Sequence, residues 1–406
     1  MKMSKLILLP VLMTSLLTSC GGGGSSNGEV TLTIWEDESN QAVVEFLAKE
    51  WAGNYKNTYP LAPQINIKIV KQVEKSAMQK LAQVAETGNG PDIASVTHDT
   101  IAGGASNKLL APVRYVDEVK AIMTEDALNA VSVDDILYGY PITAESMVLM
   151  YDKSQVKDPS QLASFESIKE NNLKVGLQLT GDDGGYYTFG LYNDAVLFGD
   201  NGKDATKVNL ATTKSIANVT KFYTEYSKDN IFDYAPNVNL PFLKQKRIQG
   251  IICAPYMLSQ AKNSLGEDLG IAKVPTINGE KERPFSGYKA YVVSKHSKNG
   301  ALAQDLANYL VNYGSQAYRL QQLGYLPACH LDTDQDIIDI LDNDPNATIF
   351  SESLSESKVM PSIPQMNGFW SLMNTASTTF KNKGSALTSA EVESTLKEVT
   401  NKLLGK

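Results

Sequence analysis

Short stretches that alternate in polarity recur along the chain between longer stretches of helical periodicity, and this order constrains the fold more than any other feature. Residues 30–35, 65–70 and 93–96 have the spacing of strands, whereas residues 40–51 and 76–86 repeat apolar side chains at helical intervals. This order predicts an α/β architecture. No repeat of 20 to 50 residues is evident in the sequence, which argues against solenoids and propellers.

The same pattern continues toward the C-terminus. Further strands are predicted at residues 139–142, 147–151, 175–178, 250–253 and 290–294, and further helices at residues 212–227, 302–313, 315–322 and 390–404. At roughly 150 residues per domain, a chain of 406 residues indicates two or three domains rather than one continuous core.

The N-terminus has the pattern of an export signal. Lys2 and Lys5 precede an apolar run that is too short to span a bilayer as a stable helix, which needs about 20 apolar residues. Its end, Leu17-Thr18-Ser19-Cys20, resembles the lipobox of bacterial lipoproteins. The sequence therefore predicts a signal peptide at residues 1–19 and lipidation of Cys20. The alternative is an ordinary secretory signal with a coincidental cysteine.

Residues 20–28 are rich in glycine and serine, and we interpret them as a flexible lipidated tether. The protein is then expected outside the cytoplasm, anchored on the outer side of the bacterial cell membrane. That compartment permits a disulfide between Cys253 and Cys329. Both lie in apolar surroundings in the sequence, so two separately buried thiols are the favoured interpretation.

The composition excludes several classes of function. The chain has 37 Lys+Arg against 45 Asp+Glu, and loss of residues 1–19 takes the formal net charge from −8 to −10. Nucleic-acid binding draws most of its affinity from the neutralisation of phosphates, so no nucleic-acid partner is expected. No HExxH, CxxC or phosphate-binding glycine motif occurs, so neither a metal nor a cofactor is predicted.

Seven segments carry a resemblance to one known family, and they follow its order over nearly all of residues 29–375. They are LTIW at 32–35, TGNGPDI at 87–93, GYPITAESMVLMYDK at 139–153, GGYYTFG at 184–190, ICAPY at 252–256, PFSG at 284–287 and VMPSIPQMNGFW at 359–370. The chain resembles the family 1 extracellular solute-binding proteins of ABC transporters, and within them the maltose/maltodextrin-binding group.

The resemblance implies an α/β protein with the type II periplasmic-binding-protein fold. Two α/β lobes are joined by a hinge, and the ligand is held in the cleft between them. One lobe would take residues 29–143 and 291–335, and the other residues 144–290 and 336–406. It also implies a non-enzymatic monomer that captures an oligosaccharide, first of all maltose or maltodextrin, by lobe closure. The loaded protein would deliver the sugar to the membrane permease of an ABC importer.

The chemistry of sugar recognition suggests which residues to examine. A pyranose has an apolar face and a rim of hydroxyls, so its site needs aromatic platforms and polar groups, among which carboxylates are strong acceptors. By resemblance, the ligand-binding acids are Asp99, Glu145 and either Asp37 or Glu38. The other ligand-binding candidates are Tyr186, Tyr187, Tyr256, Trp370 and Asn374. Trp35 and His98 are interpreted as structural.

Each candidate has a structural alternative. Asp99 would serve as a helix N-cap, and Glu145 as a solvated hinge residue. Trp370 would belong to the core, and the tyrosines at 186–187 would lie on the surface of a glycine-rich turn. Residues 37–38 are adjacent on extended backbone, so their side chains face opposite ways and at most one lines the site.

The departures from the maltose-binding pattern leave the ligand open. Val96 stands in place of a Trp, Thr100 and Asn374 in place of Arg, Ser371 in place of a Tyr and Tyr256 in place of a Trp. The rim at residues 74–78 is not retained either. Another oligosaccharide is therefore an alternative ligand. A glycoside hydrolase is a second alternative, since paired carboxylates beside aromatic rings also serve glycosidases, and a glycan-binding surface protein is a third.

Overall fold

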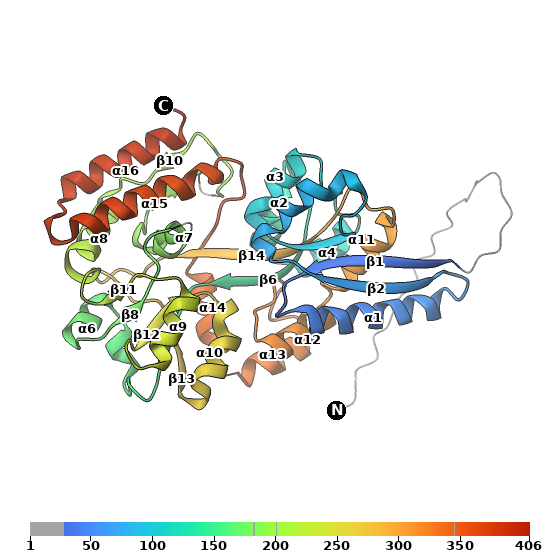
Figure 1. Cartoon of the computed structure of the whole chain (residues 1–406), viewed down its shortest axis with the longest axis horizontal. Coiled ribbons are helices and arrows are strands. Elements are labelled where there is room, and N and C mark those ends of the chain that lie inside the picture. Colours follow the sequence, from blue (N-terminus) through green and yellow to red (C-terminus); the bar gives the residue numbers. More distant parts are fainter. Residues whose placement is uncertain (1–27, 182, 200, 345) are drawn as a thin grey trace.

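The structure of this protein is a computed structural model, which describes residues 28–181, 183–199, 201–344 and 346–406. Its elements gather around two separate sheets, and Figure 1 shows the two groups side by side along the long axis of the molecule. No helix among these residues has both the length and the apolar character needed to cross a membrane.

The first sheet contains strands from both ends of the chain. Its strands are Glu29–Glu36 (β1), Gln64–Lys71 (β2), Ile93–Thr97 (β3), Tyr140–Ser146 (β6), Phe285–Val293 (β14) and Lys358–Val359 (β15). The order is β15-β14-β3-β1-β2, and β6 also pairs with β14. Because β1 and β3 are parallel, their carboxyl ends meet at one edge of the sheet, where ligand sites of α/β proteins typically lie.

Eight helices of the described residues contribute buried side chains to the core around this first sheet. They are Gln41–Thr58 (α1), Glu74–Val84 (α2), Ile101–Ser106 (α3), Val116–Ile122 (α4), Glu125–Ala130 (α5), Gly300–Tyr309 (α11), Tyr313–Leu323 (α12) and Gln335–Asp342 (α13). In α1 the buried residues Val43, Val44, Leu47 and Trp51 recur every three or four positions, which is why this segment is a helix with one face in the core.

The second sheet is built from the middle of the chain. Its strands, in spatial order, are Ile231–Phe232 (β11), Val175–Gly176 (β8), Gly250–Cys253 (β12), Val148–Asp152 (β7) and Leu269–Ala272 (β13). The helices of this half are Phe165–Glu170 (α6), Gly184–Thr188 (α7), Thr213–Lys221 (α8), Pro236–Lys244 (α9), Leu258–Leu265 (α10), Ala347–Ser355 (α14), Met366–Lys383 (α15) and Ser389–Leu403 (α16). Short hairpins pair Ser132–Val133 (β4) with Ile136–Leu137 (β5), and Val196–Leu197 (β9) with Val208–Asn209 (β10).

Two antiparallel strands, β6 and β14, run between the two halves (Figure 1). In β6, Ala144 packs in the first core, and Met147, just after the strand, packs in the second. In β14, Phe285 belongs to the second core and Tyr288 to the first. Each strand therefore changes core within three residues, and these are the positions where a hinge would bend.

The lobe boundaries drawn from the sequence stay a prediction. Core membership adds one detail, because Ile337 of α13 packs with the first core although residues 336–406 were expected in the other lobe. The helix α13 also lies against α12 of the first half.

Most of the predicted elements are present, with shifted ends. The predicted strand at 290–294 is the last part of the longer β14, and the predicted helix at 212–227 is α8 followed by a π-helical turn, Phe222–Tyr226 (η5). Trp35 is 6% exposed and packs in the first core, as expected. Cys253 and Cys329 are buried free thiols, so the interpretation as two separate buried residues is confirmed.

His98 ties the two cores together close to the crossing. It lies in a 3₁₀ turn, His98–Thr100 (η2), and is fully buried. Its Nδ1 accepts a hydrogen bond from the backbone N–H of Tyr288 at 3.1 Å, so its Nε2 carries the hydrogen and donates to the carbonyl of Met360 at 2.8 Å. Tyr288 belongs to the first core and Met360 to the second, which confirms the structural interpretation of His98.

Replacing His98 by Ala is expected to lower the free energy of unfolding by about 2–4 kcal/mol, because a buried N–H and a buried carbonyl both lose their partner. Urea unfolding followed by circular dichroism measures this loss. His296→Ala, at an exposed position, is the matched control and is expected to leave the midpoint unchanged. Equal midpoints for the two variants would contradict this role of His98.

Candidate functional site

Glu145 and Tyr186 meet where the two halves join. Glu145 lies at the end of β6, directly opposite Gly287 of β14, and Tyr186 comes from α7 of the second half. A Cβ atom placed on Gly287 would lie 3.8 Å from Oε1 of Glu145 and 4.0 Å from the hydroxyl of Tyr186. A glycine at this position therefore leaves open the space beside the carboxylate and the phenol.

Three polar side chains in this region lack hydrogen-bond partners among the described residues. They are Asp99, whose Oδ1 is buried, Tyr186, whose hydroxyl is buried, and Glu145. Buried polar atoms in native proteins are nearly always hydrogen-bonded, so unsatisfied acceptors beside an unsatisfied donor indicate a place for a polar ligand. Asp99 gives no capping hydrogen bond to η2 or α3, so the interpretation as a helix N-cap is wrong.

The electrostatic surroundings of Glu145 and Tyr186 affect how each side chain can form hydrogen bonds. Burial raises the pKa of Glu145, the ammonium of Lys289 counteracts the rise, and the charge of Glu74 adds to it. Burial and then the carboxylate of Glu145 raise the pKa of Tyr186 well above its ordinary value, so the phenol remains a donor at neutral pH. Glu145 is half-buried, and both its ligand role and the alternative of a solvated hinge residue stay predictions.

Aromatic rings form one wall next to these polar groups. The hydroxyls of Tyr187 and Tyr256 share a hydrogen bond of 2.7 Å, and the rings of Tyr186 and Tyr187 meet edge to face at 5.3 Å. Burial raises the pKa of Tyr256 to about 12, so this pair stays protonated. The Tyr256 side chain is 37% exposed, which leaves apolar ring surface available to a ligand.

Trp370 of α15 joins this wall through α7. A Cβ atom on Gly185 would lie only 3.0 Å from Cβ of Met373 and 3.6 Å from Cε3 of Trp370, so the glycine lets α7 pack closely on the face of α15 next to the indole. The indole packs edge to face against Phe369 at 5.1 Å and remains partly exposed. Its interpretation as a core residue therefore accounts for one side of the ring and leaves the other side for a ligand.

Asn374, one turn further along α15, is engaged within the protein. Its Oδ1 accepts a hydrogen bond of 2.8 Å from the backbone N–H of Gly181, in the loop before α7. Asn374 thereby holds the segment that carries the tyrosines, and a direct contact with ligand stays a prediction.

Asp37 and Glu38 directly follow the end of β1. Glu38 is exposed and pairs with Lys71, while Asp37 accepts hydrogen bonds from the backbone N–H and the hydroxyl of Ser39 at 3.2 and 3.0 Å. Neither forms a hydrogen bond or ion pair with Glu145 or Tyr186 among the described residues. A ligand role for either acid stays a prediction.

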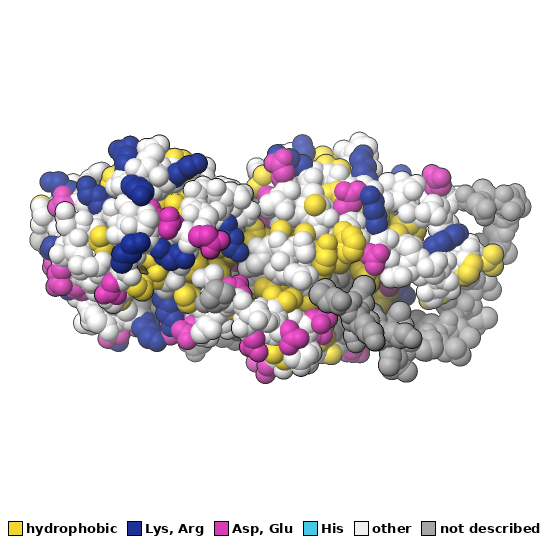
Figure 2. All heavy atoms as spheres, turned by 90° about the horizontal axis from the view of Figure 1, so that it is seen from below, with side chains coloured by type: hydrophobic (Ala, Val, Ile, Leu, Met, Phe, Trp, Pro, Cys, Tyr) yellow, Lys and Arg dark blue, Asp and Glu magenta, His cyan; other side chains and the backbone are white. Residues whose placement is uncertain are grey.

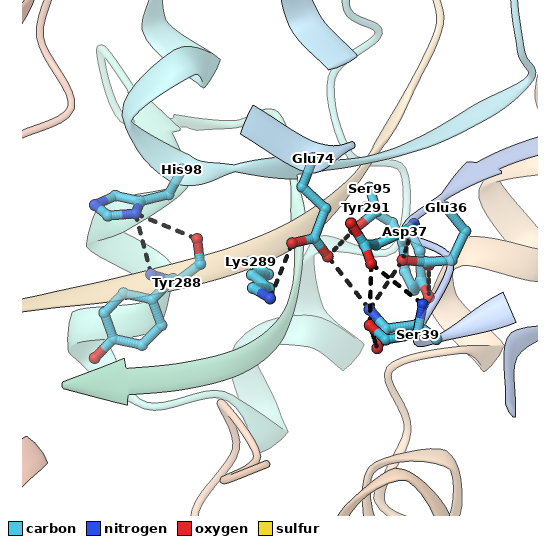
Figure 3. A network of polar contacts seen from close by, with 10 residues as sticks. Glu36, Asp37, Ser39, Glu74, Ser95, His98, Tyr288, Lys289 and Tyr291 are labelled. Carbon is cyan, nitrogen blue, oxygen red and sulfur yellow. Dashed lines mark hydrogen bonds and ion pairs between the residues drawn. The ribbon is translucent and has the colours of Figure 1, made fainter. Parts of the chain in front are cut away.

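A buried network lies beside Asp37, and the sequence analysis did not identify it (Figure 3). Asn40 Nδ2 donates to Glu36 at 3.1 Å and to Glu74 at 3.4 Å, and the hydroxyl of Tyr291 donates to Glu36 at 2.8 Å. Glu74 also forms an ion pair of 2.9 Å with Lys289. Burial and the neighbouring Glu74 raise the pKa of Glu36 to about 7. Residues from four segments of the chain therefore stabilise the buried carboxyl groups of Glu36 and Glu74 at this edge of the first sheet.

An ion pair between Lys75 of α2 and Asp183, just before α7, bridges the two halves. Both side chains are largely exposed, so the pair contributes about 1 kcal/mol at most. The sequence analysis did not carry over the rim at residues 74–78, yet the structure places Glu74 and Lys75 beside the site. One signal for this region was present in the sequence, because Lys289 is a lone charge in the otherwise apolar strand FSGYKAYVV.

The other hollows of the molecule involve different residues. A cavity of about 290 Å³ in the second half is lined by Met147, Leu162, Glu282 and Ser353 among others, and holds none of the predicted site residues. Among the described residues, no group of three or more His, Cys, Asp or Glu side chains could hold a metal ion. On the face shown in Figure 2, the described basic and acidic side chains are interspersed rather than gathered into a basic stripe.

Two α/β halves joined by crossing strands, with unsatisfied acids and aromatic rings meeting at the crossing, define a two-lobed binding protein. The family model described as bacterial extracellular solute-binding protein matches residues 52–331, and the chain belongs to this family. It is a solute-binding protein rather than a glycoside hydrolase, as expected.

Relatives of this chain include transport proteins of two bacteria. A maltooligosaccharide ABC transporter solute-binding lipoprotein of Streptococcus pneumoniae is 26% identical over 91% of this chain and 90% of its own length. A galactooligosaccharide-binding protein of Bacillus subtilis is 26% identical over 93% of this chain and 92% of its own length.

Solved structures confirm the type II periplasmic-binding-protein fold. MalX of Streptococcus pneumoniae, in complex with maltopentaose, superimposes with a TM-score of 0.76 at 22% identity, and covers 92% of this chain and 99% of its own. The maltose-binding protein MalE of Listeria monocytogenes, in complex with maltose, gives a TM-score of 0.74 at 22% identity over 94% and 99%.

Tyr186→Phe is expected to leave the free energy of unfolding of the ligand-free protein unchanged or up to about 1 kcal/mol higher, because the hydroxyl it removes is buried without a partner. Tyr187→Phe is the matched control and is expected to cost about 1 kcal/mol, because it breaks the hydrogen bond with Tyr256. Denaturant unfolding compares the two. An equal loss in both variants would show that the Tyr186 hydroxyl has a structural partner.

Proposed function

We propose that this protein binds an oligosaccharide between its two lobes, with maltodextrin as the first candidate, and delivers it to an ABC importer. The observation that carries the proposal is the pair of buried, unsatisfied polar atoms on Asp99 and Tyr186, with the half-buried Glu145 nearby and exposed ring surface beside them. Carboxylates accept hydrogen bonds from sugar hydroxyls, and aromatic rings pack on the apolar face of a pyranose.

The relatives support an oligosaccharide and leave two linkage classes to compare. One is named for maltooligosaccharides and the other for galactooligosaccharides, at equal identity to this chain. The site departs from the maltose-binding pattern at Thr100 and Asn374, where guanidinium groups are missing, and at Ser371, where a ring is missing. Because these hydrogen-bond donors are missing, we expect the ligand to be held mainly by hydrogen bonds to the carboxylates and by packing on the aromatic rings.

Binding would be coupled to closure of the lobes about β6 and β14. The proposed lobes comprise residues 29–143 with 291–335, and residues 144–290 with 336–406. Asp99 comes from the first half and Tyr186 from the second, so a ligand that contacts both favours the state in which they approach. The ion pair between Lys75 and Asp183 supports the closed arrangement.

Calorimetric titration with maltotetraose, maltose and a β-linked galactotetraose tests the ligand class. Saturable binding of maltotetraose is expected, with weaker binding of maltose because fewer sugar rings reach the aromatic wall. Saturation by the galactotetraose alone would replace maltodextrin by galactooligosaccharide as the ligand. No saturation by any of the three would overturn the proposed function.

The same titration with Trp370→Ala locates the site. Removal of the indole is expected to weaken maltotetraose binding about tenfold or more, through the loss of ring packing. Tyr234→Ala, which removes a ring that is 51% exposed on the second half, is the matched control and is expected to bind normally. Equal affinities for the two variants would place the sugar elsewhere.

We also propose that the protein is a lipid-anchored monomer on the outer side of the cell membrane, with the permease subunits as its partner. Cys20 and residues 1–19 lie outside the described residues, and so does most of the proposed tether at residues 20–28. The lipobox-like sequence supports the anchor, as does the word lipoprotein in the name of the Streptococcus pneumoniae relative. Two or more acyl chains would hold the protein stably at the membrane.

Replacing Cys20 by Ala removes the thiol that would carry the lipid. In cells that express the full chain, the variant is expected to move from the membrane fraction to the soluble extracytoplasmic fraction or to remain unprocessed, as measured by immunoblotting. Cys329→Ser is the matched control and is expected to stay with the membrane. A membrane-bound, processed Cys20→Ala variant would contradict the lipid anchor.

A further inference from the structure

Lys289 is a buried cation on the strand that crosses between the lobes. Its side chain is 12% exposed, and its Nζ pairs with Oε2 of Glu74, which is 8% exposed, at 2.9 Å. The ring of Tyr325 lies 5.5 Å from the ammonium. A buried charge is costly unless it is paired and hydrogen-bonded, and Glu74 provides such a partner.

The strand register places Lys289 on the same face as the binding site. Gly287 pairs with Glu145 across the antiparallel ladder, and Lys289 pairs with Thr143. Residues two apart on a strand share a face, so Lys289 and Glu145 are diagonal neighbours, which long side chains can bridge. The electrostatics agree, because Lys289 is the strongest charged influence on the pKa of Glu145 and acts to lower it.

Glu74 is the ion-pair partner of the ammonium. Its Oε1 accepts a hydrogen bond from the hydroxyl of Ser95 at 3.0 Å and a longer one from Asn40 at 3.4 Å, so the carboxylate is fixed within the first half. Glu145, in contrast, accepts no hydrogen bond from the described residues. The ammonium is therefore paired with a carboxylate that has internal partners, and on β14 Lys289 is a diagonal neighbour of a carboxylate that has none.

We propose that Lys289, held by Glu74, is a positioning residue of the binding site, which keeps Glu145 ionised so that its carboxylate can accept hydrogen bonds from sugar hydroxyls. This inference rests on the proposed function, and in it Lys289 and Glu74 determine how well Glu145 accepts hydrogen bonds from the sugar. None of the seven segments that carry the family resemblance contains Glu74 or Lys289.

Other groups also act on Glu145, and the test has to separate them from Lys289. Tyr186, Tyr256 and Tyr325 are neutral phenols at neutral pH, because their pKa values are raised mainly by burial. The titratable and charged groups of the surrounding elements are Lys289 of β14, Glu74 of α2, Tyr186 of α7, Tyr256 of the turn Pro255–Met257, Tyr325 after α12, Asp99 of η2 and Asp183 before α7.

Two substitutions are expected to act in opposite directions. Lys289→Met removes the cation that lowers the pKa of Glu145, so as the pH is lowered the affinity for maltotetraose should begin to fall at a higher pH than in the wild type. Glu74→Gln removes a neighbouring negative charge and releases Lys289 toward Glu145, so the fall should begin at lower pH. If Lys289 and Glu74 had a purely structural role, both substitutions would weaken maltotetraose binding. The two profiles of affinity against pH would then not move in opposite directions.

Calorimetric titrations with maltotetraose between pH 4.5 and 8.5 measure these profiles. Lys221→Met is the matched control, because it breaks a partly buried ion pair with Glu166 at 2.7 Å in the second half, and its profile should match the wild type. Near-ultraviolet circular dichroism verifies that each variant is folded. Profiles that coincide, or that move in the same direction, would overturn the inference.

A second readout needs no sugar. Carbon-13 NMR of labelled glutamate side chains, with Glu145 assigned through Glu145→Gln, follows the ionisation of this carboxylate directly. Its midpoint should rise in Lys289→Met and fall in Glu74→Gln, and unchanged midpoints would overturn the inference. Absence of maltotetraose binding together with opposite NMR shifts would instead reject maltodextrin as the ligand and leave the role of Lys289 standing.

Discussion

The antiparallel pairing of β6 with β14 is the interaction on which the rest of this structure depends. It is the ladder by which the first sheet reaches toward the second half, and its register sets Glu145 opposite Gly287. Had the register slipped by one residue, Glu145 would face the other side of the ladder. Gly287 then lies beside both polar groups, since a Cβ atom on it would be 3.8 Å from Oε1 of Glu145 and 4.0 Å from the hydroxyl of Tyr186.

Some of the buried polar groups around this ladder are hydrogen-bonded within the protein, and others have no hydrogen-bond partner among the described residues. Glu36 and Glu74 are buried but hydrogen-bonded, and His98 uses both ring nitrogens to tie the cores. Asp99 and Tyr186 are partly buried, yet each keeps a polar atom without a partner. The cost of leaving such atoms unpaired is about 1–3 kcal/mol each, which a ligand with many hydroxyls would recover on binding.

The fold could be predicted from the sequence more fully than the site. Periodicity located β1, α1 and α16 because their apolar residues repeat along one face. It missed α15, in which Gly368 and Asn374 interrupt the pattern while Phe369 and Met373 still reach the core. Motif resemblance predicted Asp99, Glu145 and the tyrosines as ligand-binding residues, and the structure brings them into one region. It could not find Lys289 and Glu74, since their pairing joins residues 215 positions apart and depends on the register of β14.

A crystal structure of the protein with bound maltotetraose tests the central claim most directly. The account predicts sugar between the two lobes, with hydroxyls within hydrogen-bonding distance of Asp99, Glu145 and Tyr186, and a pyranose ring packed on Trp370. It also predicts that Lys289 remains paired with Glu74 in that complex. Sugar bound elsewhere, with these three polar side chains uncontacted, would contradict the account.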